Sequence, residues 1–430
     1  MKKILIIAGD FIPYSPSLGG VIRILTLSEF LIRNGFEVHI ITSKSKFFGY
    51  FGYEESLKKI SVHYIENRIQ SYIFKSTADK KKYLDDKGYG KAKKGRLIKR
   101  LTTGIKYRMK NIVLEFCVPD INIFMKDKFV KKAVELIKNE DIANLLISSP
   151  PHSMQVVGTK LKKYFGNKIN YIADYRDSWN TIRLFSKNNF ISKTLSRHYE
   201  KKALCASDFF TFISDPMLPK VEKLYSIDIK YKSRLVMNGF IEEINGNSKK
   251  QNNNKIIIGY FGAISDSKNS MRDISKMLDL LEKKPGLSDK LEFHFYGDVT
   301  ISNHDPGKIP MVKVSGSLDH KDALKEMLAM DYLLLVHSDR QSSDEVITGK
   351  FFEYVAARKP VLCLGPEDME ARRLVTRYNL GINIDIFNED DMFDKLRSLQ
   401  DIDPGKFYGD IDINIFKRDV QYEKFLGLLR

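Results

Sequence analysis

Residues 4–42 read ILIIAGDFIPYSPSLGGVIRILTLSEFLIRNGFEVHIIT and hold two short apolar runs separated by a segment of helix length. The runs at 4–8 and 37–42 are rich in Ile and Val and have the length of strands. Two neighbouring strands joined through a helix lie parallel to each other. These residues therefore predict the start of a parallel α/β sheet of the Rossmann type.

The alternation of strand and helix continues, breaks once and starts again. In the first half, apolar strands are also expected at 60–65, 144–148, 170–174 and 208–213. A polar, turn-rich stretch, EEINGNSKKQNNN at 242–254, then indicates a linker. Beyond the linker we expect strands at 255–261, 290–296, 311–315, 331–336, 360–364 and 381–385.

This pattern predicts two doubly wound α/β domains, one at 1–245 and one at 255–405. Residues 406–430 are expected to form a C-terminal helix that packs back toward the first domain. In sheets of this kind, ligands bind outside the carboxyl ends of the strands. Two such sheets facing each other would therefore define a cleft.

Composition narrows the class of protein. With 430 residues, 43% of them hydrophobic, the chain can bury a large interior. Its three cysteines form no CxxC pair and leave an odd thiol under any pairing, which favours a reducing compartment. No apolar stretch approaches the roughly 20 residues needed to span a bilayer, and the run at 4–8 is too short for a signal peptide. We therefore expect a globular protein that is not integral to a membrane.

Part of the net charge of +17 is concentrated in a predicted insertion at about 68–115. Within it, residues 75–110 hold fourteen Lys or Arg against three Asp, which is the footprint of a surface that binds a polyanion. A solvated insertion and a nucleic-acid site are alternatives. Aromatic and aliphatic residues interleave with the charges, and no RNA- or DNA-binding signature lies nearby. We expect an anionic membrane surface as the partner and no nucleic acid.

A second segment, DEVITGKFFEYVAARKP at 344–360, combines features of phosphate and sugar binding. Thr348 and Gly349 are expected at the N-terminus of a helix, where free N–H groups and the helix dipole favour phosphate, and Lys350 adds a positive charge. Glu345 and Glu353 flank this turn, and carboxylates accept hydrogen bonds from vicinal hydroxyls. The combination indicates a sugar nucleotide, although a solvated loop residue and a helix-surface residue would explain the two glutamates equally simply.

Several motifs together resemble one family over nearly the whole chain. They are the opening at 4–42, SSPPHS at 148–153, IADYRDSW at 172–179, GYFGAIS at 259–265, FYGD at 295–298 and the segment with Glu345 and Glu353. In order and spacing they resemble the retaining glycosyltransferases of the GT-B fold called GT4, and among these the bacterial enzymes that build surface polysaccharides. The resemblance implies two Rossmann-like domains facing a cleft.

In the first domain, the resemblance implies that the loop ending in Gly19 and Gly20 lies over the donor diphosphate and the acceptor. It also implies that His152 lies over the donor sugar, although an isolated histidine is often structural. Arg176, Asp177 and Trp179 follow a strand and are expected to hold acceptor or sugar, with an internal Arg–Asp ion pair as the alternative. His152, Glu345 and Asp177 are the candidate catalytic residues.

In the second domain, the resemblance implies contacts to the donor. Lys268 and Arg272 are expected to contact the diphosphate, but many relatives place an arginine directly after the glycine where this chain has Ala263, so the choice of cation stays open. Helix N–H groups at Thr348 and Gly349, with Lys350, would stabilise the leaving group. Glu345 would contact sugar hydroxyls. Glu353 would contact ribose hydroxyls, and no metal or other cofactor is expected.

The function implied is a retaining, metal-independent hexosyl- or N-acetylhexosaminyl-transferase that uses a nucleotide-sugar, most simply a UDP-sugar. The acceptor would be a lipid-linked or glycan precursor of capsule, O-antigen or exopolysaccharide. The expected location is cytoplasmic, peripheral on the inner face of the cell membrane. Two alternatives remain open, a sugar-nucleotide epimerase of the same fold and a non-catalytic protein that binds nucleotide or nucleic acid.

Overall fold

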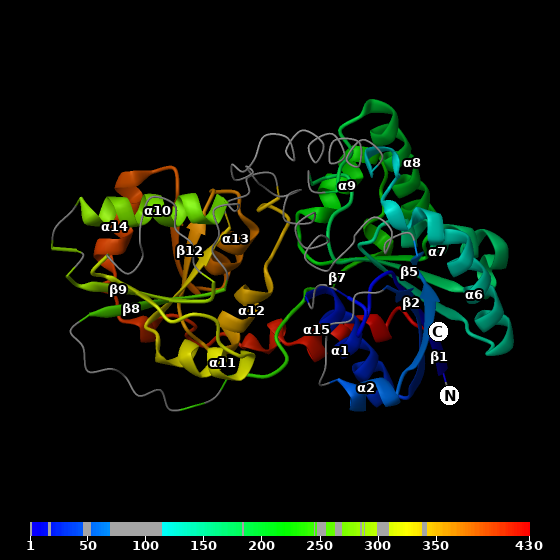
Figure 1. Cartoon of the computed structure of the whole chain (residues 1–430), viewed down its shortest axis with the longest axis horizontal. Coiled ribbons are helices and arrows are strands. Elements are labelled where there is room, and N and C mark those ends of the chain that lie inside the picture. The colour runs from blue at the N-terminus through cyan, green and yellow to red at the C-terminus, as the bar shows by residue number, and fades with distance from the viewer. Residues whose placement is uncertain are drawn as a thin grey trace, which may run out of the picture. The chain divides into compact units, whose positions relative to one another are not determined.

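The chain forms two compact units in a computed structural model (Figure 1). The residues that the structure describes are 2–15, 19–45, 53–68, 114–182, 185–244, 246, 255–262, 269–283, 286–287, 289–298, 309–337 and 342–430. Among them, unit 1 comprises the residues up to Met237 together with Gln421–Arg430, and unit 2 comprises Asn238–Val420. The predicted basic block at 75–110 lies outside the described residues, as does most of the predicted linker at 242–254.

Unit 1 is built on a seven-stranded parallel sheet with the order β3-β2-β1-β4-β5-β6-β7. Its strands are β1 (Lys2–Ala8), β2 (Phe36–Lys44), β3 (Ser61–Glu66), β4 (Asn144–Ser149), β5 (Asn170–Tyr175), β6 (Phe209–Phe212) and β7 (Ser233–Leu235). Ile6 of β1 lies opposite both Ile40 and Leu146. The first six strands match the apolar runs predicted from the sequence. The short β7 was not predicted, because only one of its three residues is apolar.

Helices cover both faces of this sheet. They are α1 (Gly19–Arg33), α2 (Glu54–Lys58), α6 (Lys126–Asn139), α7 (Ser153–Phe165), α8 (Phe190–Ala206), α9 (Met217–Tyr225) and α15 (Arg418–Leu426), with 3-10 turns at Ile121–Met125, Gly166–Lys168 and Lys230–Lys232. Leu5 and Ile7 of β1 belong to the core shared with α6 and α7, whereas Ile4 and Ile6 belong to the core shared with α1 and the end of α15. This alternation of side chains along a buried strand is what a doubly wound sheet requires.

Unit 2 repeats the plan with a six-stranded parallel sheet of order β10-β9-β8-β11-β12-β13. The strands are β8 (Ile256–Phe261), β9 (Leu291–Tyr296), β10 (Val312–Val314), β11 (Tyr332–Val336), β12 (Val361–Gly365) and β13 (Gly381–Asp385). The helices are α10 (Asn269–Glu282), α11 (His320–Ala329), α12 (Gly349–Ala356), α13 (Glu370–Arg377) and α14 (Glu389–Ser398), with 3-10 turns at Pro404–Lys406 and Ile413–Phe416. The prediction of an α/β fold with two parallel sheets is confirmed.

The C-terminal helix α15 begins in unit 2 and ends in unit 1. Its Tyr422 packs against Phe30 of α1 with ring centroids 5.9 Å apart, and the Tyr422 hydroxyl lies 3.0 Å from Thr26 Oγ1. Cys117, Cys205 and Cys363 are all free thiols. No helix of the described residues is both long and apolar enough to cross a membrane.

Candidate functional site

The predicted substrate-binding residues that the structure describes are divided between unit 1 and unit 2. In unit 1, Gly20 stands in the first turn of α1, and a Cβ atom at this position would collide with Nη1 of Arg176. The glycine thus provides the predicted close approach, but the group that approaches is the Arg176 guanidinium. Arg176 Nη2 donates to the carbonyl of Pro150, whereas its buried Nε finds no acceptor in the part of the chain described. Burial lowers the pKa of Arg176.

His152 is buried in an aromatic box. It follows β4 at the N-cap position of α7, with 2% of its surface exposed. Its ring stacks on Trp179 with centroids 5.0 Å apart and meets the edge of Phe185 at 4.9 Å. Neither ring nitrogen has a hydrogen-bond partner among the described residues. Burial, helped by the charge of Arg176, lowers the pKa of His152 to about 3, so the imidazole is neutral at pH 7.

The loop that carries Trp179 is fixed by α8. Trp179 is fully buried, and its indole N–H donates to Ser196 Oγ at 3.0 Å. Asn180 Nδ2 donates to Glu200 Oε2 at 2.7 Å, and the Tyr225 hydroxyl donates to the same oxygen at 2.6 Å. The structure therefore places Trp179 behind His152 and inside the unit. Ser196 and Glu200 were not identified from sequence, because the spacing of polar residues on a helix does not show which groups they form hydrogen bonds with.

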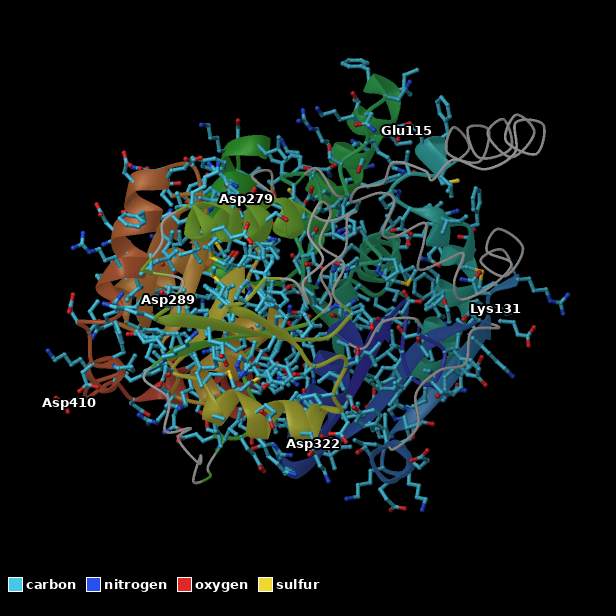
Figure 2. All side chains as sticks on the ribbon, turned by 60° about the vertical axis from the view of Figure 1, so that its left-hand side comes forward. Glu115, Lys131, Asp279, Asp289, Asp322 and Asp410 are labelled. Carbon is cyan, nitrogen blue, oxygen red and sulfur yellow. The ribbon has the colours of Figure 1, made fainter. Side chains whose placement is uncertain are left out.

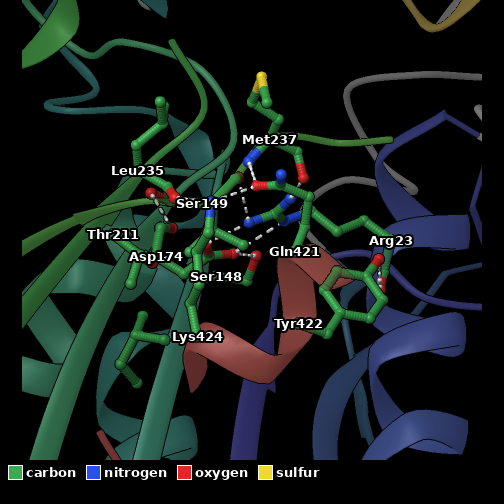
Figure 3. Close-up of polar contacts among 12 residues, drawn as sticks. Arg23, Ser148, Ser149, Asp174, Thr211, Leu235, Met237, Gln421, Tyr422 and Lys424 are labelled. Carbon is green, nitrogen blue, oxygen red and sulfur yellow. Dashed lines mark hydrogen bonds and ion pairs between the residues drawn. The ribbon is translucent and has the colours of Figure 1, made fainter. Parts of the chain in front are cut away.

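An internal Arg–Asp ion pair is present, but its arginine is Arg23 rather than Arg176. Asp174 at the end of β5 accepts hydrogen bonds from Arg23 Nη2 at 2.9 Å and from the hydroxyls of Ser148 and Thr211, each at 2.8 Å (Figure 3). Burial alone would raise the pKa of Asp174, and Arg23 with the two hydroxyls brings it below its ordinary value. The sequence analysis missed Arg23, although a lone arginine within the apolar run VIRIL at 21–25 could have indicated a buried ion pair.

Asp177, the third catalytic candidate, is partly buried on the same loop. Burial raises the pKa of its carboxyl to about 6, against the opposing effect of the Arg176 charge. Its carboxyl is therefore mostly ionised at pH 7, yet it can hold a proton in mildly acidic solution. Among the predicted residues of unit 1, the structure brings His152, Arg176 and Trp179 together around the carboxyl ends of β4 and β5.

In unit 2, helix α12 begins where the sequence predicts. Thr348 is its N-cap residue with extended backbone, and Gly349 is its first residue. Gly349 is exposed, and a Cβ atom added to it would meet none of the described residues within 4 Å. The first N–H groups of a helix have no partner within it. The Thr348 hydroxyl likewise has no hydrogen-bond partner among the residues described.

Lys350 is held over the end of β8. Its Nζ lies 3.1 Å from the Tyr260 hydroxyl and 4.3 Å from the centroid of the Tyr260 ring. Gly262 has φ of +137°, and a Cβ atom there would collide with this ammonium group. Burial lowers the pKa of Lys350 to about 8, although Glu353 acts in the opposite direction. Tyr260 was part of the quoted motif GYFGAIS, but its contact with Lys350 could not be anticipated from spacing.

The two glutamates differ in their surroundings. Glu353 lies on α12 and is partly buried; burial raises its pKa, while His320, Lys350 and Arg418 lower it. Glu345 is 1% exposed on the turn that precedes α12, where its N–H donates to the Ser342 carbonyl at 3.0 Å. Of the predicted diphosphate contacts, Lys268 lies outside the described residues, and so does the side chain of Arg272 in α10.

No family model and no curated protein matches the sequence. Solved structures do resemble it. The apo form of the lipopolysaccharide outer core galactosyltransferase WaaB is 14% identical, with 99% of each chain covered and a TM-score of 0.59. The α,α-trehalose-phosphate synthase (UDP-forming) of Burkholderia xenovorans in complex with glucose-6-phosphate is 10% identical, with 100% of each chain covered and a TM-score of 0.62. A mutant of S. aureus TarM in complex with Fondaparinux, alpha-GlcNAc-glycerol and UDP is 13% identical, with 100% of this chain and 99% of that chain covered and a TM-score of 0.55. Such low identity shows the fold alone, and that fold is a pair of parallel α/β sheets of the GT-B type.

Proposed function

We propose that the protein is a glycosyltransferase that moves a sugar from a nucleotide-sugar to an acceptor. The observation that carries the proposal is the place of Lys350, whose partly buried ammonium group is held over Gly262 at the carboxyl end of β8. This cation stands on the first turn of α12, next to the exposed Gly349 that begins the helix. A cation and a helix N-terminus on one turn suit a diphosphate.

In the proposed reaction, the bond between the anomeric carbon and the diphosphate oxygen breaks and a bond to an acceptor oxygen forms. Negative charge develops on the diphosphate, and Lys350 with the first N–H groups of α12 stabilises it. Each such donor contributes on the order of 3 kcal/mol in a water-excluded site. The diphosphate takes the acceptor proton, with attack from the leaving-group side and retention of configuration. In this scheme Glu345 and Glu353 orient sugar and ribose hydroxyls and do not attack.

In unit 1, His152 and Asp177 are the proposed contacts to the reacting sugars. A neutral imidazole can both donate and accept a hydrogen bond, which suits a sugar hydroxyl better than an ionised ring would. Trp179 acts through His152 by stacking, since it is itself fully buried. The Arg176 guanidinium lies beside Gly20 in the first turn of α1, and its Nε has no partner among the described residues, so it can bind an anionic or hydroxyl group of either substrate.

The finer parts of the proposal follow the family resemblance. By that resemblance, we propose a GT4-like retaining transferase of the hexosyl- or N-acetylhexosaminyl class. It would need no metal and would use a UDP-sugar as donor. Two of the similar structures involve UDP, as the product formed or as a ligand, which supports the choice of nucleotide. The acceptor is proposed to be lipid-linked or a glycan in surface polysaccharide synthesis. The enzyme would then work at the inner face of the cell membrane.

A thermal-shift screen against UDP-, GDP-, ADP- and dTDP-sugars tests the donor class, because a ligand that binds only the folded state raises Tm. We expect a rise with UDP-sugars that the Glu353→Ala variant reduces. Glu345→Gln should keep the fold and lose transfer. The exposed Glu367, also in unit 2, provides a matched control, and Glu367→Gln should behave as the wild type. Wild-type transfer by both active-site variants would overturn the assignment.

A further inference from the structure

The outer end of α8 reverses the usual distribution of side chains between core and solvent. In its first two turns the buried residues are Ser192 and Ser196, whereas Phe190 is 81% exposed, Ile191 is 69% exposed and Leu195 is 39% exposed. A surface helix of a globular domain normally buries its apolar side chains and exposes its polar ones. A cluster of large apolar side chains kept in solvent indicates an interaction surface.

A second segment brings another aromatic residue to this end of the helix. Glu115 Oε1 accepts hydrogen bonds from the N–H groups of Asn188 at 2.6 Å and Asn189 at 2.8 Å. Lys187 Nζ donates to the Leu114 carbonyl at 2.9 Å. Figure 2 shows Glu115 beside the outer end of α8. Phe116, 57% exposed, therefore stands close to the same end, and we call Phe116, Phe190, Ile191 and Leu195 the apolar tip.

The charge of the neighbouring sequence indicates the kind of partner. Residues 75–110, which precede Leu114 in the sequence and lie outside the described residues, hold fourteen Lys or Arg against three Asp. On α8 itself, Lys193 lies between Ile191 and Leu195 of the apolar tip, and Arg197 follows Leu195 by two residues. Exposed aromatic and aliphatic side chains next to a strongly basic sequence are the combination that binds the headgroup layer of an anionic membrane. A purely apolar protein partner would not need that charge.

The same helix reaches the candidate site of unit 1. Phe185, five residues before Phe190, packs edge-on against His152 at 4.9 Å. Further along α8, Ser196 receives the indole N–H of Trp179. The first two turns of α8 therefore carry exposed apolar side chains on one side and, on the buried side, Ser196, which supports the His152 box.

We propose that the apolar tip of α8 inserts into the surface of an anionic lipid bilayer, and that unit 1 takes its acceptor from that surface. The second part rests on the proposed transferase function and assigns the acceptor to the lipid-linked class. The first part is a statement about membrane binding alone. It can be tested without any sugar nucleotide.

The test is co-sedimentation of the full chain with vesicles of phosphatidylcholine, with and without phosphatidylglycerol, at moderate salt. Phe190→Ser combined with Ile191→Ser should weaken binding to the anionic vesicles by roughly tenfold or more, because two large side chains no longer leave water. The matched control is Tyr231→Ser, which removes a 75% exposed aromatic next to Lys232, the residue that caps the opposite end of α8. This control should bind as the wild type does.

A second variant reports insertion directly. Phe190→Trp keeps the tip apolar and adds one indole to a chain whose only other tryptophan, Trp179, is fully buried. Its emission should shift to shorter wavelength with anionic vesicles and be quenched by brominated lipid. Three results would each overturn the membrane assignment: wild-type sedimentation by the double serine variant, equal binding to neutral vesicles, or emission from the Phe190→Trp variant that does not respond to lipid.

The outcomes also separate the two proposals. If vesicle binding depends on the tip but no nucleotide-sugar raises Tm, the membrane surface stands and the transferase proposal fails. Both proposals stand if UDP-sugars bind and two acceptors behave differently. The wild type and the double serine variant should then glycosylate a water-soluble acceptor equally, whereas the variant should glycosylate a lipid-linked acceptor more slowly. Equal rates on both acceptors would overturn the claim that the acceptor comes from the bilayer.

Discussion

The two units share a strand order but use charge at their strand ends in opposite ways. In unit 1, Asp174 at the end of β5 is surrounded by Arg23 and two hydroxyls, and Arg23 also donates to the carbonyls of Val236 and Met237 at 3.1 Å each. In unit 2, Lys350 over the end of β8 contacts the ring and the hydroxyl of one residue, Tyr260, and Glu353 acts on it only through its charge. Asp174 therefore has a direct ionic partner inside the protein, whereas the direct contacts of Lys350 are to the neutral Tyr260.

The pKa shifts express the same difference. The surroundings of Asp174 lower its pKa and so favour its charged form, whereas burial lowers the pKa of Lys350 to about 8 and so disfavours the ammonium. A partly buried cation whose charge is disfavoured gains most from an anionic ligand. A charged residue near a strand end of this fold is therefore not by itself a binding residue. Its partners decide whether it stabilises the chain, as Arg23 and Asp174 do, or can bind a ligand, as we propose for Lys350.

The largest expected effect is on the stability of unit 1. Arg23→Met leaves the Asp174 carboxylate buried without its cation and should lower the free energy of unfolding of this unit by about 3–5 kcal/mol. Trp179 is the only tryptophan and lies in unit 1, so its fluorescence during urea unfolding follows this unit. Amide exchange in β11 and β12 should stay unchanged. An equal loss of protection there would show that Arg23 does not act within unit 1 alone.

Thr211→Val is the matched, milder change in the same network. It removes one neutral donor to Asp174 and should cost about 1–2 kcal/mol. The ratio between the two variants measures how much of the stability comes from the charge. If Thr211→Val cost as much as Arg23→Met, packing rather than ionic pairing would explain the network.

The second largest effect is expected at Lys350. Lys350→Gln removes the cation at the proposed diphosphate site and should lower the transfer rate by roughly 10²–10³ while leaving the fold intact. Lys395→Gln, which removes an exposed lysine from α14 of the same unit, should have no effect. Gly262→Ala should imitate Lys350→Gln in part, since the added Cβ displaces the ammonium. Calorimetry with UDP checks all three, and unchanged UDP affinity in Lys350→Gln would remove the basis of the proposal.

The fold could be predicted from sequence because each buried parallel strand is a continuous apolar run. The runs at 4–8 and 331–336 correspond to β1 and β11 within a residue or two. The missed β7 is held in place by pairing with β6 rather than by its own composition. Residue pattern therefore finds strands with an apolar run of their own, including the partly exposed β3, and misses β7, which has none.

The candidate site was only partly predictable. The start of α12 at Thr348 and Gly349 is a local property of the chain and was found. The pairing of Arg23 with Asp174 joins residues 151 positions apart, and that of Lys350 with Tyr260 joins residues 90 positions apart. Such contacts depend on sheet order, which a linear pattern does not contain. The types of residue in the site could therefore be predicted from sequence, but their contacts with one another could not.

A smaller effect is expected from pH, and it should separate the contribution of the Lys350 amine from that of the Asp177 carboxyl. The Lys350 amine is protonated below about pH 8 and loses its charge as pH rises through that value, so UDP affinity should be flat below pH 8 and fall above it, by up to tenfold per pH unit. A bound diphosphate would raise this pKa and limit the fall. Asp177 ionises as pH rises through about 6, so transfer should increase there if its carboxylate contacts the acceptor. Asp177→Asn should remove only this acidic limb, and an unchanged limb would exclude Asp177.

The smallest expected effect is that of a chelator. Among the described residues, Glu37, His39 and Glu140 lie close enough together to hold a metal ion. However, Lys3 Nζ lies 2.8 Å from Glu140 and 3.7 Å from Glu37, so a fixed cation already balances these carboxylates.

This group also lies at the wrong end of its sheet for catalysis. Lys3 and Glu37 stand near the beginnings of β1 and β2, whereas ligands of such sheets bind beyond the carboxyl ends. In the proposed site the leaving diphosphate is met by Lys350 and a helix N-terminus, which supply the positive charge that Mg²⁺ or Mn²⁺ supplies in metal-dependent enzymes. EDTA should therefore change the transfer rate less than twofold. An absolute requirement for either ion would mean that Lys350 does not carry the leaving group, and the contrast between the two units would lose its functional meaning.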